Sequence, residues 1–168
     1  LRAFNAQVPM LAQWDDHEVS NNWSDSKVFD DRYTEENVRL LAARAARAFH
    51  DFMPIAPMAA EQNRVYRKVS YGPLLDVFFI DMRRYRGPNG DNLETAEPET
   101  AGGGNARFLG RDQIEWLKRE LLASRATWKV ISADMPLSLL VWDNGKDKKG
   151  HEGIANNEGD AQDAVSWS

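Results

Sequence analysis

The feature that most constrains the fold is a nearly continuous apolar run from Leu74 to Met82. A strand that is apolar on both faces must be covered on both sides, which is typical of the interior of a sheet. Residues 65–70 alternate in character just before it, and Tyr71-Gly72-Pro73 separates the two segments with turn-forming residues. This pattern predicts a hairpin-like pair whose second strand is buried on both faces.

Two helices are predicted from apolar residues at steps of three and four. The first extends from Thr34, a suitable N-cap, to Met53 before Pro54. Its expected core stripe consists of Val38, Leu41, Ala45, Phe49 and Phe52, with Arg39, Arg44 and Arg47 on the solvated face. The second extends from Arg111 to Ser124, and its expected inward residues are Ile114, Leu117, Leu121 and Leu122.

Two further short strands are expected, at Pro9–Trp14 and at Trp128–Ser132. The resulting order of strand, helix, strand, strand, helix, strand indicates a mixed α/β (α+β) layer fold. A long loop is predicted between Gly87 and Gly104, and the chain from Asp143 onward is polar enough to be irregular. With 168 residues, the chain has room for one modest domain.

The formal net charge of −5 argues against a surface for nucleic acid or anionic membranes, which usually carries a basic excess. No stretch reaches the roughly 18 apolar residues of a membrane span. The chain has no cysteine, so thiolate ligands and a cysteine nucleophile are excluded. The oligomeric state is not specified by these patterns.

Four consecutive ionisable residues, Asp15-Asp16-His17-Glu18, follow the first expected strand, and Asn21 and Asn22 come shortly afterwards. Carboxylates and amide oxygens bind hard cations, and an imidazole can bind a metal or donate a proton. Hydrolysis of a phosphate ester needs these functions together. The same residues could also begin a surface loop whose charges face water, and composition alone leaves both interpretations open.

The segment Gln13-Trp14-Asp15-Asp16-His17-Glu18-Val19-Ser20-Asn21-Asn22-Trp23 resembles the signature of the PhoD-like alkaline phosphatases, which belong to the calcineurin-like metallophosphatases. Further segments resemble this family in the same order, at residues 79–86, 109–117, 128–137 and 152–156. The resemblance implies a layered β-sandwich flanked by helices, incomplete in this chain. It also implies hydrolysis of phosphate mono- or diesters, a cofactor set such as iron with calcium, and a periplasmic or secreted location.

Carried over by position, the resemblance assigns Asp16, with Asp15, to metal binding and His17 to catalysis as the group that assists the leaving oxygen. Asn21, Asn22 and Arg83 are assigned to the substrate. Arg83 follows a buried strand and could bind a phosphate with its forked donors, or it could form a surface salt bridge.

The family's flanking metal-binding segments are not found in this sequence. The expected organisation is a partial metallophosphatase domain over residues 1–159 and an atypical tail over residues 160–168. The alternative to an enzyme is therefore a non-catalytic fragment that retains some affinity for metal or phosphate.

Overall fold

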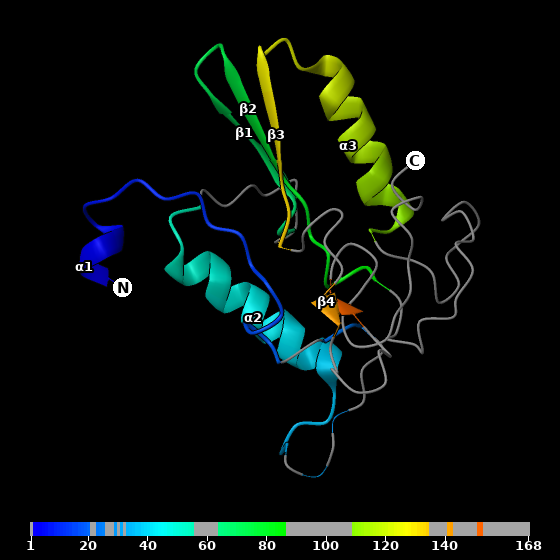
Figure 1. Cartoon of the computed structure of the whole chain (residues 1–168). Helices are drawn as coiled ribbons and strands as arrows, with labels where there is room; N and C mark the ends of the chain where they lie inside the picture. Colours follow the sequence, from blue (N-terminus) through cyan, green and yellow to red (C-terminus); the bar gives the residue numbers. More distant parts are fainter. Residues whose placement is uncertain are drawn as a thin grey trace.

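The computed structural model describes residues 2–20, 23–25, 29, 31, 33–55, 64–86 and 109–134, together with the backbone of 141–142 and 151–152. The helices and strands are, in chain order, α1 (Arg2–Asn5), α2 (Val38–Phe52), β1 (Arg67–Tyr71), β2 (Leu75–Phe79), α3 (Arg111–Ala123), β3 (Trp128–Ser132), β4 (Val141–Trp142) and β5 (His151–Glu152) (Figure 1).

The larger sheet has the strand order β1-β2-β3. β1 and β2 form the predicted antiparallel hairpin, whose turn places Gly72 at a φ of 67°, a conformation that favours glycine. β3 pairs parallel to β2, with Val130 beside Val77. Residues 76–79 of β2 are all buried, so the prediction of a central strand covered on both faces is confirmed. The mixed α/β class is confirmed as well.

A smaller sheet joins β4 to β5, with Trp142 paired to His151. β5 lies within the stretch after Asp143 for which an irregular chain is expected, and the prediction is wrong at these two residues. The predicted loop 87–104 and the tail 160–168 fall outside the described residues.

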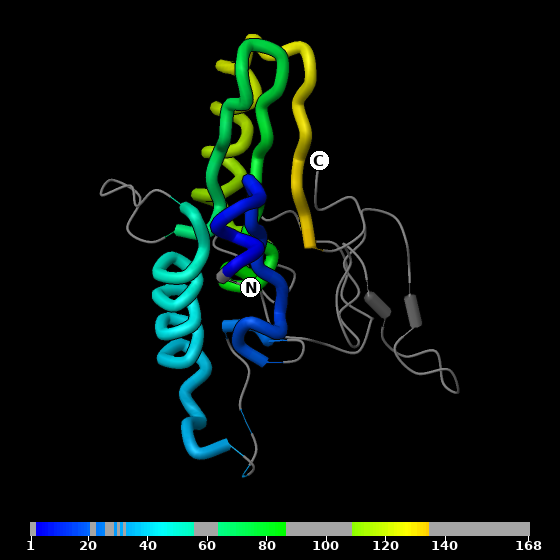
Figure 2. The backbone as a smooth tube through the Cα atoms, turned by 90° about the vertical axis from the view of Figure 1, so that its left-hand side faces the viewer, coloured from blue at the N-terminus to red at the C-terminus, as the bar shows by residue number. Residues whose placement is uncertain are grey.

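The helix α3 covers one face of the larger sheet and stands beside it in Figures 1 and 2. Its Trp116 and Leu117 are buried in a cluster with Tyr66, Phe78, Ile80, Met82 and Leu109. Ile114 and Leu121 pack against this cluster from its margin, as expected of inward residues. Leu122 is 88% exposed, so its predicted inward position is wrong. It follows Leu121, which packs against the cluster, and so points about 100° further round the helix, away from the cluster.

The helix α2 packs against a second cluster, which contains Trp14 and Trp23. The helix begins after Asn37, whose side chain accepts a hydrogen bond from the Leu40 amide, so the predicted N-cap at Thr34 is wrong. Ala42 and Ala46 are buried alongside Val38 and Phe49. Leu41 packs at the margin of the cluster, and the three predicted solvent-facing arginines are exposed.

The last member of the predicted stripe on α2, Phe52, is 63% exposed and therefore does not belong to the core. Met53, four residues after Phe49, packs against the cluster in its place, so Phe52 lies beside the buried stripe and not in it. Within the described residues, no helix is long and apolar enough to cross a membrane.

Residues 9–14 do not form the predicted strand. Leu11 is half exposed, whereas Ala12 and Trp14 are buried. The segment is attached to the sheet through side chains: Arg67 donates to the carbonyl of Ala12, and Gln13 donates to the carbonyl of Ile80. These two side-chain hydrogen bonds, and not a backbone ladder, hold residues 9–14 against the sheet.

Candidate active site

The acidic segment, residues 15–18, lies at the carboxyl ends of the parallel strands β2 and β3. Trp14 Nε1 donates a 3.1 Å hydrogen bond to Oδ1 of Asp81, two residues beyond β2. Asp15 is joined through Arg83 to Asp134, two residues beyond β3. Open α/β sheets usually bind ligands at this edge. The sequence predicts a position beyond a strand end, but the strands are β2 and β3 and not residues 9–14.

Arg83 forms two ion pairs in different directions. Its Nη2 lies 2.8 Å from Oδ1 of Asp15, and its Nε lies 2.7 Å from Oδ2 of Asp134. The guanidinium side chain is only 4% exposed. The alternative of a salt bridge is therefore confirmed. A surface position is wrong, because Arg83 is enclosed by the turn after β2, the turn after β3 and the acidic segment.

The two carboxylates that share Arg83 have opposite electrostatic properties. Burial alone would raise the pKa of Asp15, but the charge of Arg83 and hydrogen bonds to the carboxylate hold it below its ordinary value. Burial, together with the neighbouring Asp15, raises the pKa of Asp134 to about 7 against the opposing effect of Arg83.

Asp16 and His17 lie together, with His17 Nε2 3.7 Å from Oδ1 of Asp16. The Asp16 side chain is 6% exposed and that of His17 is 73% exposed. The backbone here is a compact turn, in which the carbonyl of Asp16 accepts hydrogen bonds from the amides of Val19 and Ser20 at 2.9 and 3.0 Å. The prediction of a loop whose charges face water thus holds for His17 but not for Asp16, whose carboxylate is buried.

Glu18 closes this turn on the other side. Its Oε2 accepts a 2.6 Å hydrogen bond from the backbone amide of Asp15. The acidic segment is therefore an internally bonded unit: the same residue whose side chain binds Arg83 has its amide held by Glu18.

Asp81 and Asp134 are site residues that the sequence interpretation does not single out. Asp81 is wholly buried, and its Oδ1 also accepts hydrogen bonds of 3.0 Å from the amides of Arg83 and Arg84. Burial raises its pKa despite these donors. An acidic residue directly after each apolar strand is the sequence signal that could have indicated both.

Gln113 of α3 fixes the backbone around Asp81. Its Oε1 accepts from the Asp81 amide at 2.7 Å, and its Nε2 donates to the carbonyls of Asp81 and Leu109 at 2.9 and 2.8 Å. A buried amide satisfied on both sides holds a loop in one conformation. The turn that carries Arg83 is thus attached to α3 as well as to β2.

Asn21 and Asn22 lie outside the described residues, so their predicted substrate contacts stay predictions. Among the residues that the structure describes, no group of three or more His, Cys, Asp or Glu side chains is arranged to hold a metal ion. Asp16 and His17 have suitable donor atoms, but as a pair they do not form a metal cage of the roughly four to six protein ligands expected.

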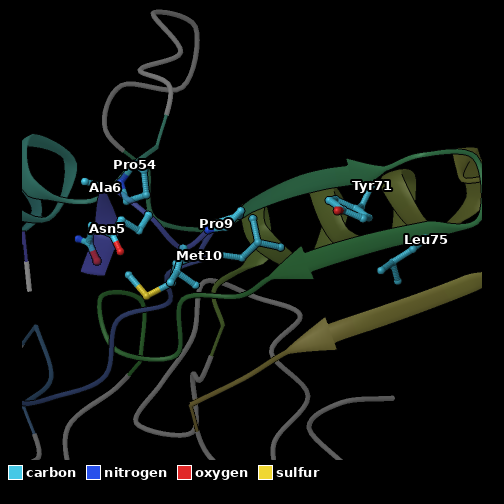
Figure 3. Close-up of a pocket in the computed structure, with 10 residues that line it drawn as sticks. Asn5, Ala6, Pro9, Met10, Pro54, Tyr71 and Leu75 are labelled. Atoms are coloured by element: carbon cyan, nitrogen blue, oxygen red, sulfur yellow. The ribbon is translucent and has the colours of Figure 1, made fainter. Parts of the chain in front are cut away.

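A hollow of about 680 Å³ lies elsewhere, between residues 5–11, Pro54 and the hairpin residues Tyr71 and Leu75 (Figure 3). Among the described side chains that line it, none is a carboxylate, an imidazole or a cation. The acidic segment is not among the described residues that line this hollow.

The mixed sheet carries an acid- and histidine-bearing turn at the carboxyl ends of its parallel strands, which is the edge where α/β domains usually bind their ligands. A sequence model described as PhoD-like phosphatase matches residues 1–166. The chain belongs to the PhoD-like phosphatase family.

Two relatives support this assignment. The chain is similar to alkaline phosphatase D of Bacillus subtilis (strain 168), with 31% identity over 136 residues, which are 79% of this chain and 23% of the relative. A solved structure of PhoD matches with a TM-score of 0.61 and 26% identity, covering 92% of this chain and 29% of that one. The chain therefore spans about a quarter of the length of these relatives.

Proposed function

We propose that this chain supplies the acidic edge of an active site that hydrolyses phosphate mono- or diesters. Membership of the PhoD-like phosphatase family supports hydrolysis of phosphoric esters. The observation that carries the proposal is the pairing of a buried carboxylate, Asp16, with an exposed imidazole, His17, at the carboxyl ends of β2 and β3. This arrangement leaves the imidazole accessible to a substrate.

His17 is proposed as the group that protonates the leaving oxygen. An alkoxide is a poor leaving group, and a positioned imidazole typically accelerates its departure by about 10²–10⁴. The carboxylate of Asp16 lies 3.7 Å from Nε2 of His17, on the side of the imidazole that faces the protein. The 73% exposure of His17 allows exchange of this proton with water after each turnover.

Substrate contacts are proposed for Asn21 and Asn22, which follow the turn directly. At the contact predicted for Arg83, a substrate oxygen would share the guanidinium with Asp134 and Asp15, which are bound to Nε and Nη2. A phosphate at that position would also be close to Asp15 and would be repelled by its charge.

Iron with calcium is the cofactor set that the resemblance implies. Carboxylate donors such as Asp15 and Asp16 suit hard cations, but the described residues do not assemble a complete cage. No step of the proposed reaction is therefore drawn through a metal. The layered β-sandwich, of which β1-β2-β3 would be a part, and a periplasmic or secreted location also belong to the proposal.

The test is hydrolysis of para-nitrophenyl phosphate and bis(para-nitrophenyl) phosphate by the purified chain, with its bound metals measured in the same sample. Hydrolysis that His17→Ala slows, by a smaller factor for these esters than for an alkyl phosphate, and that Arg39→Ala, an exposed arginine of α2, leaves intact would support the proposal. Absence of hydrolysis with and without added iron and calcium salts would favour a non-catalytic fragment.

A further inference from the structure

We propose that Arg83 is a positioning residue, which holds the acidic segment at the carboxyl ends of β2 and β3 by binding Asp15 and Asp134 together. The inference gives Arg83 an indirect role in the site. It rests on the proposed function for its catalytic meaning, but its structural part is independent of activity.

The guanidinium of Arg83 joins three segments that are far apart in the sequence. Arg83 lies 68 residues from Asp15 and 51 residues from Asp134 in the sequence, yet it binds both at 2.8 and 2.7 Å. The turn after β2, the turn after β3 and the acidic segment are thus joined by one side chain. The planar fork of an arginine can bind two carboxylates at fixed angles, which a lysine cannot reproduce.

Arg83 and Asp134 are buried, whereas Asp15 reaches solvent. Arg83 is 4% exposed and Asp134 is 3% exposed, whereas Asp15 is 53% exposed. A buried charge without a partner is strongly unfavourable, so Arg83 keeps its carboxylates close. Asp15 is the partner that solvent reaches, and its ion pair with Arg83 therefore acts mainly by drawing the acidic segment inward.

The Asp15–Arg83 ion pair is linked to the Asp16–His17 pair through the hydrogen bonds of the turn. The amide of Asp15 is bonded to Glu18, and the carbonyl of Asp16 is bonded to the amides of Val19 and Ser20. A turn bonded in this way moves as a unit. Fixing the Asp15 side chain therefore fixes the direction in which His17 points.

The same fork makes a direct role on the substrate unfavourable. Two of its donor nitrogens are bound by Asp15 and Asp134, so a phosphate at the guanidinium would have to share it with these two acidic side chains. The charge of Asp15 would repel the phosphate. An arginine that binds phosphate directly is instead expected to present its donors to the open site.

The experiment is amide hydrogen exchange of the full chain by NMR, read at Val19 and Ser20, whose hydrogen bonds to Asp16 report the turn. Asp15→Asn leaves the buried Arg83–Asp134 pair in place, so it tests the contact even where Arg83→Gln fails to fold. We expect exchange at both amides to be roughly threefold to thirtyfold faster in Asp15→Asn. Exchange in the middle of α2 and α3 should stay unchanged.

Arg84→Gln is the matched control, because it removes the same charge one residue further along and should leave the two amides unaffected. If Arg83→Gln folds, the double variant with Asp15→Asn should exchange little faster than Arg83→Gln alone, since Arg83→Gln already removes the contact with Asp15. Unchanged exchange in Asp15→Asn, or fully additive effects in the double variant, would overturn the inference.

A titration with inorganic phosphate separates the positioning role from direct binding. If Arg83 contacts phosphate itself, Asp15→Asn removes its competitor and phosphate binds more tightly than in the wild type, which would overturn the inference. Equal or weaker binding supports it. Because neither readout requires turnover, a failure of the proposed function would leave the exchange result fully interpretable.

Discussion

The indole of Trp14 donates its Nε1 hydrogen to Oδ1 of Asp81 across 3.1 Å, and both side chains are wholly buried. This bond lies one residue before the Asp15–Arg83 ion pair and acts between the same two segments. Together they fix residues 14 and 15 against residues 81 and 83. The position of the acidic segment thus depends on specific side-chain bonds, since it shares no strand ladder with the sheet.

Replacing Trp14 by Phe should therefore cost more than the lost ring area suggests. The substitution removes one donor from a buried carboxylate, a loss of about 1–3 kcal/mol in the free energy of unfolding. Urea denaturation followed by circular dichroism measures it. Trp128→Phe is the matched control, because Trp128 is exposed and should change the free energy by less than about 0.5 kcal/mol. Equal effects would contradict the role assigned to the Trp14–Asp81 bond.

The sheet could be predicted well because its signals are local. A fully apolar run, a Gly-Pro turn and an alternating partner define β1 and β2 within about 20 residues. β3 is predicted at its observed bounds. Residues 9–14 have the same apolar character, but whether such a segment joins a ladder depends on a free strand edge nearby, and a single segment cannot specify that.

The candidate site could be predicted in part. The acidic segment is visible because its four ionisable residues are consecutive. Asp81 and Asp134 are single carboxylates far apart in the chain, and their meeting with residues 14–15 depends on how β2 and β3 pair. Their burial, which changes their protonation, is a property of the packed fold and not of the local sequence.

The start of α2 shows how a local signal can be misread by a few residues. Thr34 and Asn37 are both good N-cap types, but only Asn37 accepts a bond from the helix, at 3.1 Å from the Leu40 amide. Asn37→Ala should lower the free energy of unfolding by about 1 kcal/mol. Thr34→Ala is the control and should have almost no effect. Thermal or urea denaturation of both variants decides between the two positions.

The core face of α2 gives a second paired prediction. Phe49 is buried against Trp14, with ring centroids 6.1 Å apart, whereas Phe52 is 63% exposed. Phe49→Ala should cost about 3–5 kcal/mol, since it leaves a cavity in the cluster. Phe52→Ala removes the same atoms from the surface and should cost less than about 1 kcal/mol. A larger loss for Phe52→Ala would show that the buried face is assigned wrongly.

The raised pKa of Asp134 predicts a pH dependence of stability. The unfolded chain releases this proton near the ordinary pKa of 3.8, but the folded protein holds it to about 7. The stabilisation is therefore complete below about pH 4 and is lost as the pH rises to about 7, so the free energy of unfolding should fall across this window. Asp15, whose pKa is lowered, contributes in the opposite sense, and its stabilisation is lost only as the pH falls below about 4.

Denaturation of the wild type and of Asp134→Asn between about pH 4 and pH 8 isolates this effect. The difference between the two proteins should change across the window, because asparagine does not titrate. Asp81 also has a raised pKa, but it is present in both proteins and so cancels in the difference. A constant difference at every pH would show that Asp134 is already ionised at the acidic end of the window.

The last prediction concerns His17 and applies to any phosphoester hydrolysis by a protein with this site. If His17 protonates the leaving oxygen, His17→Ala should lower kcat for an alkyl phosphate by about 10²–10⁴. A para-nitrophenyl ester leaves as a stable anion, so its kcat should fall by a smaller factor. Equal losses for both esters would mean that His17 acts on the site in some way other than proton transfer to the leaving group.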